Sequence, residues 1–156
     1  MNQMQLIAVY GNPMTDRIAF ETKFMKTVDT MRWRGKIKAL PVKIYMNKNL
    51  QAPFGRVMDE LIATGLYREI KTWDGCYNVR YQRGSRTMLS RHSWGLAIDM
   101  NATWNPLVSV NPANRAAMRA KYVQWSEPFL DIWRKHGFMC GADWTNKLDG
   151  MHFELK

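Results

Sequence analysis

Two short stretches of the chain decide its fold: residues 90–99 read SRHSWGLAID, and residues 149–154 read DGMHFE. In residues 96–100 apolar side chains alternate with smaller or polar ones, which is the two-residue period of a half-buried strand. Gly95 supplies a turn just before that segment. The same alternation recurs in residues 151–155. The sequence therefore predicts two strands, each with one face in the core and one polar face.

The polar faces carry a candidate metal site. His92 lies in the turn before the first strand, Asp99 lies on the polar face of that strand, and His152 lies on the polar face of the second. Two imidazoles and a carboxylate are a ligand set that zinc accepts when a fourth position stays open for water. Asp149, three residues before the last histidine, is placed to act on that water. The pattern indicates a zinc hydrolase.

Each of these residues has a simpler interpretation when it is taken alone. A single histidine is more often a core or surface residue, and an aspartate beside Asn101 can simply open a turn. The two clusters together favour the metal site, because the chain has three histidines and two of them lie in strand-like segments near carboxylates. The third, His136, sits in the basic last turn of a predicted helix before Gly137, and we leave it outside the site.

The two stretches resemble a known family. Ser90, His92, Gly95, Ala97 and Asp99 match the pattern S-x-H-x-x-G-x-A-x-D, and Asp149, His152, Phe153 and Glu154 match the ending D-x-x-H-F-E, of the VanY-like D-alanyl-D-alanine carboxypeptidases and L-alanyl-D-glutamate endopeptidases. The resemblance implies that His92, Asp99 and His152 bind zinc and that Asp149 is the catalytic general base. It also implies a fold like that of these peptidases and of the distantly similar Hedgehog signalling domain.

Further segments extend the resemblance over most of the chain. Residues 75–80 look like the segment that carries the family's substrate-polarising arginine, and residues 141–144 resemble the Trp/Gly-rich turn ahead of the last strand. Residues 9–13 are similar to the opening of several phage-encoded members. Residues 14–36 carry no family feature.

The arginine implied by the resemblance is Arg80, which would stabilise the tetrahedral oxyanion or hold a substrate carboxylate. Arg83 and Arg86 compete with it for that role.

These residues together predict the order of proton transfers. Zinc lowers the pKa of a bound water to about 7, and Asp149 would take the water's proton and return it to the leaving amine. Glu154 lies on the same strand face as His152 and would orient it. Ser90 would brace the turn that holds His92, and we give a Ser90 nucleophile little weight.

Length and composition predict one catalytic domain, residues 1–156, and the absence of repeats and of a low-complexity linker predicts no separate wall-binding module. No apolar run approaches the ~20 residues of a membrane span. Residues 1–5 have neither a charged n-region nor an apolar h-region, so we expect synthesis in the cytoplasm without a signal peptide and another route to the cell wall. We also expect a monomer.

Two cysteines, Cys76 and Cys140, are too few for a disulfide framework. Cys140 follows apolar residues and is most simply a buried thiol. The count alone leaves a bridge between the two open. Neither cysteine is in a C-x-x-C pair, so neither is a candidate metal ligand.

The formal charge of +10 predicts an anionic partner or surface. Basic residues concentrate in residues 23–48, which hold a single acid, and in residues 80–91. Aromatic residues between them are compatible with nucleic acid, but no nucleic-acid-binding motif is present. We therefore favour electrostatic attraction to the anionic cell wall and expect no nucleic acid partner.

The architecture predicted is α+β, with an antiparallel sheet that carries the site and with flanking helices, because strands and helices do not alternate regularly. Residues 54–62 have the spacing of an amphipathic helix that Gly65 terminates. The remaining predictions are helices over residues 112–125 and 126–137, and strands over residues 37–45, 66–70 and 77–81.

Three classes of function follow. The first is a zinc peptidase acting on peptidoglycan stem peptides, with an L-alanyl-D-glutamate endopeptidase of phage-lysis type preferred over a D-alanyl-D-alanine carboxypeptidase. The second is a domain that binds zinc without catalysis, and the third is a basic nucleic-acid-binding protein. Asp149 favours the first over the second, because a structural zinc site has no need of a carboxylate beside its open position.

Overall fold

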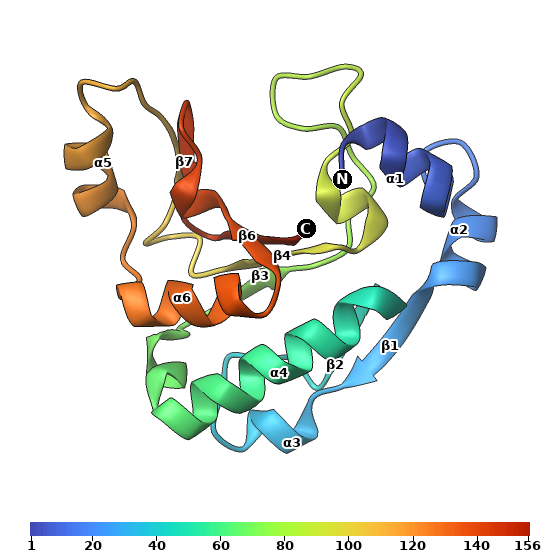
Figure 1. Cartoon of the computed structure of the whole chain (residues 1–156). Coiled ribbons are helices and arrows are strands. Elements are labelled where there is room, and N and C mark those ends of the chain that lie inside the picture. Colours follow the sequence, from blue (N-terminus) through green and yellow to red (C-terminus); the bar gives the residue numbers. More distant parts are fainter.

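A computed structural model describes all 156 residues, and its centre is a four-stranded antiparallel sheet (Figure 1). In spatial order its strands are β3 (Trp73–Gly75), β4 (Ala97–Met100), β8 (His152–Leu155) and β6 (Phe138–Cys140). Two further antiparallel pairs are β1 (Met25–Asp29) with β2 (Lys43–Asn47) and β5 (Leu107–Ser109) with β7 (Lys147–Asp149). The predicted α+β class with an antiparallel sheet is confirmed.

Helices surround this sheet. The α-helices are α1 (Gln3–Tyr10), α2 (Arg17–Phe24), α3 (Met31–Arg34), α4 (Lys48–Thr64), α5 (Arg115–Tyr122) and α6 (Glu127–Lys135). Three short 3-10 helices are η1 (Leu66–Glu69), η2 (Arg91–Trp94) and η3 (Gly141–Asp143). Figure 1 shows α4 and α6 on one side of the sheet, with α1 and β7 on the other.

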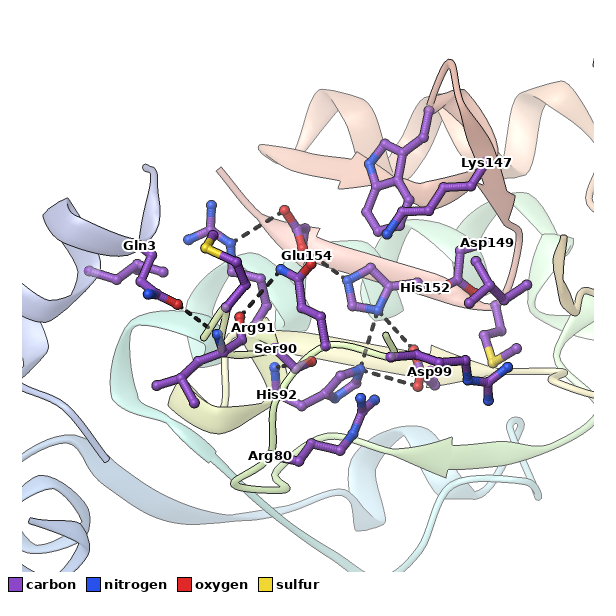
Figure 2. Close-up of a pocket in the computed structure, with 18 of the residues that line it drawn as sticks. Gln3, Arg80, Ser90, Arg91, His92, Asp99, Lys147, Asp149, His152 and Glu154 are labelled. Carbon is purple, nitrogen blue, oxygen red and sulfur yellow. Dashed lines mark hydrogen bonds and ion pairs between the residues drawn. The ribbon is translucent and has the colours of Figure 1, made fainter. Parts of the chain in front are cut away.

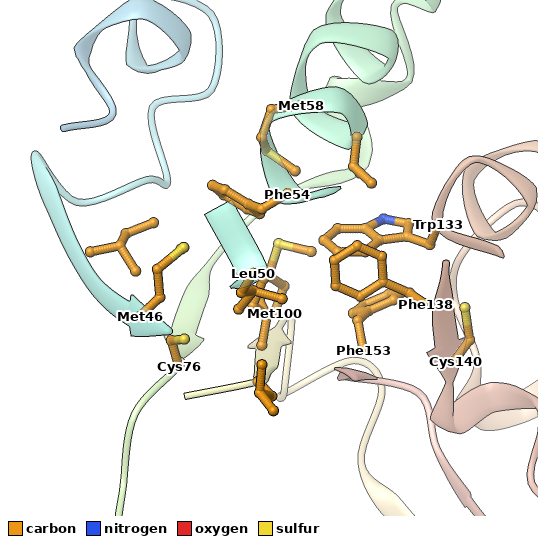
Figure 3. Close-up of a cluster of buried hydrophobic side chains, with 14 of the residues drawn as sticks. Met46, Leu50, Phe54, Met58, Cys76, Met100, Trp133, Phe138, Cys140 and Phe153 are labelled. Atoms are coloured by element: carbon orange, nitrogen blue, oxygen red, sulfur yellow. The ribbon is translucent and has the colours of Figure 1, made fainter. Parts of the chain in front are cut away.

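The core lies between the sheet and the pair α4 and α6 (Figure 3). From α4, Phe54 and Met58 are fully buried in the same cluster as Met100 of β4. From α6, Trp133 stacks on Phe153 of β8 with ring centroids 4.3 Å apart. Aromatic pairs of this kind add to the free energy gained from burial. One face of β4 and β8 is therefore fixed against a dense apolar layer.

The amphipathic helix predicted for residues 54–62 is confirmed as part of α4. Gly65 adopts the left-handed conformation, with φ at +78°, and ends the helix as predicted. The helix begins earlier than expected because Asn47 is its N-cap, with a side-chain oxygen that accepts from Asn49 N at 3.0 Å.

The pairing of β4 with β8 determines which side chains lie on the face of the sheet that points away from the core. Ile98 lies opposite Phe153, and Asp99 lies opposite His152. Because side chains alternate across a strand, Asp99 and His152 share the face that points away from the core. The two predicted strands and their polar faces are confirmed.

Two predicted strands are wrong. Residues 66–70 form η1, because the turn that Gly65 opens continues as 3-10 hydrogen bonds such as Ile70 N to Tyr67 O at 3.1 Å. Residues 77–81 form a loop with one isolated bridge, between Tyr81 and Leu89. Their backbone groups bond instead to the turn that holds His92, as in Asn78 N to His92 O at 3.1 Å.

Two other predictions are right in type but wrong in extent. The strand expected over residues 37–45 begins at Lys43, because the residues up to Pro41 form turns. The helix expected over residues 112–125 is α5, which begins at Arg115, because Asn111 and Asn114 exchange side-chain to backbone hydrogen bonds that hold the preceding turn. The helix expected over residues 126–137 is confirmed as α6, with the Ser126 side chain as its N-cap.

Cys76 and Cys140 are both free and buried, so the bridge that the count left open does not form. No helix has the length and apolar character needed to cross a bilayer.

Candidate metal centre

His92 lies in η2, the single helical turn between the loop of residues 77–90 and β4. Ser90 caps this turn, and Gly95 ends it in the left-handed conformation. A Cβ atom on Gly95 would lie 2.9 Å from the backbone nitrogen of Asn47, so only glycine fits there. The His92 ring is 4% exposed, and its Nδ1 lies 2.7 Å from the carbonyl oxygen of Cys76. The Nδ1–H group therefore donates to that carbonyl, and the lone pair of Nε2 faces the pocket.

His152 and Asp99 complete a three-residue cluster with His92 (Figure 2). His152 Nδ1 lies 3.0 Å from Asp99 Oδ1, and His92 Nε2 lies 3.1 Å from Asp99 Oδ2. The two ring nitrogens are 3.2 Å from each other. On its other side, His152 Nε2 lies 3.0 Å from Glu154 Oε2. The sequence-predicted ligand residues therefore converge, and the outer nitrogen of each histidine has an acceptor.

This arrangement fits a zinc ion. Donor atoms about 2.0–2.1 Å from a tetrahedral zinc lie about 3.3 Å apart, which is close to the separations in the cluster. Each imidazole donates its outer N–H to an oxygen, which fixes the tautomer and directs the other lone pair inward. Two lone pairs facing each other repel unless a cation lies between them. The donor chemistry is therefore that of a metal site with histidine and carboxylate ligands.

The charges around the cluster also favour a cation. Burial lowers the pKa of His152, but the nearby carboxylates of Asp99 and Glu154 outweigh it and raise the pKa to about 9. Burial raises the pKa of Asp99, but the adjacent rings of His152 and His92 hold it well below its usual range. Positive charge is thus stabilised where the three side chains meet.

Asp149 reaches the same pocket from β7, outside the central sheet. Its backbone pairs with Leu107 of β5, and it packs so closely over Gly141 that a Cβ atom there would lie 2.3 Å from the Asp149 carbonyl oxygen. Its Oδ1 is buried and has no hydrogen-bond partner in the protein. Burial raises the pKa of this carboxyl, and the negative charge of Asp99 raises it further. Asp149 lines the same pocket as the cluster, so its carboxylate is placed to accept a proton from a bound molecule.

The cluster and Asp149 line one pocket of about 890 Å³. Its cationic lining residues are Arg80, Arg83, Arg91 and Lys147. The Arg80 side chain is exposed and labelled beside His92 in Figure 2. Arg83 also lines the pocket, whereas Arg86 does not. Of the three arginines that are candidates for substrate binding, two therefore line the pocket.

Sequence reasoning missed several residues of this pocket. Met1, Asn2, Gln3 and Leu6 of the N-terminal segment line it, although no local pattern marks them. Arg91 pairs with Glu154. The sequence offered one indication of this pair: Arg91 directly precedes His92, and Glu154 follows His152 by two residues. The ring of Trp144 lies 5.3 Å from that of His152.

Comparison with known proteins finds a match to the part of the chain that contains the candidate metal centre. A family model described as D-alanyl-D-alanine carboxypeptidase matches residues 83–155, which include the whole His92, Asp99 and His152 cluster and Asp149. The match confirms the resemblance drawn from the two motifs. Arg80 lies just before the matched segment. No curated protein and no solved structure matches the chain.

Proposed function

We propose that this protein is a zinc peptidase that cleaves L-alanyl-D-glutamate bonds in peptidoglycan stem peptides, because residues 83–155 match the family model described as D-alanyl-D-alanine carboxypeptidase. The family accounts for a peptidase acting on peptidoglycan. The observation that carries the metal proposal is the convergence of inward-facing donor atoms from His92, Asp99 and His152. The basic chain, and the similarity of residues 9–13 to phage-encoded members, favour a phage-lysis role.

The three convergent residues would hold the ion, and Glu154 would keep His152 in its tautomer. A bound zinc ion supplies a Lewis acid that makes water nucleophilic at neutral pH. The rest of the chemistry belongs to side chains of the chain itself. Asp149 accepts the proton of the attacking water and then donates it to the leaving amine. The position of Asp149 in the lining of the pocket, beside the three candidate ligands, supports this role.

Arg80 would bind the substrate. Its guanidinium is exposed at the pocket, and of its nitrogens only Nη1 has a protein partner, the carbonyl oxygen of Tyr81 at 3.3 Å. A guanidinium with free N–H groups suits a carboxylate or a developing oxyanion. Arg83 lines the same pocket and is the alternative.

We further propose that residues 1–156 act as one catalytic domain, as a monomer, without a separate wall-binding module among them. The packing of the N-terminal residues into the pocket of the C-terminal motifs supports a single unit. The net charge of +10 would attract the chain to the anionic wall.

A D-alanyl-D-alanine carboxypeptidase is the second candidate, and the description of the matching family favours it. Mass spectrometry of the products from defined peptidoglycan fragments separates the two. Release of a terminal D-alanine supports the carboxypeptidase. Cleavage between L-alanine and D-glutamate supports the endopeptidase.

The zinc proposal is tested by metal analysis of the purified protein. We expect one zinc per chain, and we expect its loss in His92→Ala, Asp99→Ala and His152→Ala, because each substitution removes one of three ligands. His136→Ala is the matched control, since His136 pairs with Glu60 away from the cluster and should keep the metal. Stoichiometric zinc in all three ligand variants would refute the site.

Wild-type protein that holds zinc but cleaves no wall fragment would favour the non-catalytic zinc domain. A salt-dependent shift with nucleic acid but none with purified cell wall would favour the third class.

A further inference from the structure

Arg91 is a nearly buried arginine at the junction of three parts of the chain. It begins η2, directly before His92, and its side chain is 11% exposed. Its Nε lies 3.4 Å from Oε1 of Glu154 in β8, and its Nη2 donates to the carbonyl oxygen of Met1. Its Nη1 is buried and has no partner. Figure 2 shows this guanidinium beside Glu154.

Glu154 divides its two oxygens between Arg91 and His152. Oε1 faces Arg91, and Oε2 lies 3.0 Å from His152 Nε2. The Glu154 side chain is 10% exposed, and an almost buried carboxylate is costly unless it is paired. The Arg91 contact thus fixes the carboxylate that in turn fixes the His152 ring.

Helix α1 holds the segment that carries Arg91 at both ends. Near its start, Gln3 Oε1 accepts from Leu89 N at 2.6 Å, and Gln3 Nε2 donates to the Thr87 carbonyl oxygen at 3.1 Å. At its end, the Gly11 carbonyl oxygen accepts from Trp94 Nε1 at 3.0 Å. These contacts join residues more than 80 positions apart; two of them hold residues just before η2, and the third holds the last residue of η2.

Each side-chain nitrogen of Arg91 either has a protein acceptor or is buried. The exposed guanidinium of Arg80, in contrast, has nitrogens without a protein partner. Nε and Nη2 already have acceptors, and Nη1 has no accessible surface for a ligand. Arg91 is therefore suited to position other groups and not to bind substrate.

We propose that Arg91, held in place by α1, is a positioning residue that acts through Glu154 to keep the Nδ1 lone pair of His152 directed at the metal. This inference rests on the proposed zinc function. It also gives the N-terminal helix a role in the site. Partners of this kind typically change metal affinity or activity by about 10–100-fold when they are removed.

The test measures the zinc dissociation constant by competition with a chromogenic chelator. We expect Arg91→Gln to bind zinc about 10–100-fold more weakly than wild type. Arg91→Lys keeps the charge near Glu154 and should recover part of the loss. Arg56→Gln, which removes an exposed arginine from α4, is the matched control and should bind zinc like wild type.

A double-mutant cycle with Glu154→Gln tests whether Arg91 acts through Glu154. We expect Arg91→Gln to weaken zinc binding little further once Glu154 is already Gln. Fully additive effects, or wild-type affinity in Arg91→Gln, would overturn the inference. Circular dichroism of the metal-free variants separates a loss of affinity from a loss of fold, and Arg91→Lys stays informative if Arg91→Gln does not fold.

Gln3→Ala should weaken zinc binding less than Arg91→Gln, because it loosens the support and leaves the ion pair. An unchanged affinity in Gln3→Ala would overturn the role of α1. If wild-type protein itself binds no zinc, the proposed function fails. If wild type binds zinc and Arg91→Gln binds it equally well, only this inference fails.

Discussion

The two sides of the pocket are built in different ways. On one side, Asp99 and His152 lie opposite each other in paired strands whose other faces are buried against α4 and α6. On the other side, the arginine loop, residues 77–90, has no strand or helix before η2. In it, Arg80 is fixed mainly through its backbone, which exchanges hydrogen bonds of 3.0 and 2.9 Å with the Ser93 hydroxyl.

This difference separates two tasks. A shift of one residue in the register of β8 would turn His152 into the core, so the register and the core together fix the candidate ligands. The loop depends on single side-chain to backbone bonds, and its tip carries exposed arginines. We therefore expect the strands to provide the chemistry and the loop to provide substrate capture.

The sharpest test of this division is Asp149, which is held by the paired strands β5 and β7 and not by the arginine loop. Asp149→Asn keeps the size of the side chain and removes the base. Hydrolysis should fall by roughly 10²–10⁴-fold while zinc stays bound. The measurements are turnover on purified wall fragments and metal content of the same sample. Near-normal turnover would move the role of the base to another carboxylate, with Glu154 the first to examine.

The second test addresses the anchor of the loop. Ser93→Ala removes the acceptor of Arg80 N and the donor to Arg80 O, so the free energy of unfolding should fall by about 1–3 kcal/mol. Because the loop would be released and the strands would not, KM should rise while zinc affinity stays unchanged. Urea unfolding, steady-state kinetics and chelator competition give the three quantities.

Thr87→Ala is the control for Ser93→Ala, since this threonine is exposed in the same loop. Zinc affinity that falls in Ser93→Ala as much as substrate binding does would contradict the division between the strands and the loop.

The same contrast explains what the sequence could predict. Strands β4 and β8 and helices α4 and α6 have regular apolar periods and local caps, so their residues alone indicate them. The motifs also predicted which ligand residues would converge. The zinc, base and substrate roles stay predictions.

The arginine loop could not be predicted in this way. Residues 77–81 have the composition of a strand, but their polar groups bond to His92 O and Ser93 Oγ, more than ten residues away. The contacts of Gln3 with Thr87 and Leu89 join the two ends of a long chain segment and leave no local pattern. Such long-range hydrogen bonds override local propensity.

The smallest expected effect concerns the choice among the arginines of the loop. Arg80→Lys keeps the charge but loses the planar fork, so one of two charge-assisted hydrogen bonds to the substrate is lost and activity should fall about tenfold even at low salt. Arg83→Lys and Arg86→Lys should lower activity only slightly, because these residues would supply only general attraction.

The three variants are compared on one wall substrate at low and high ionic strength, where screening should weaken that general attraction in all of them. A wild-type rate in Arg80→Lys together with a crippled Arg83→Lys would transfer the capture role to Arg83, which also lines the pocket, and would leave the metal centre untouched. If all three variants keep the wild-type activity, the loop is only a solvated basic surface, and the strand side must bind the substrate as well as cleave it.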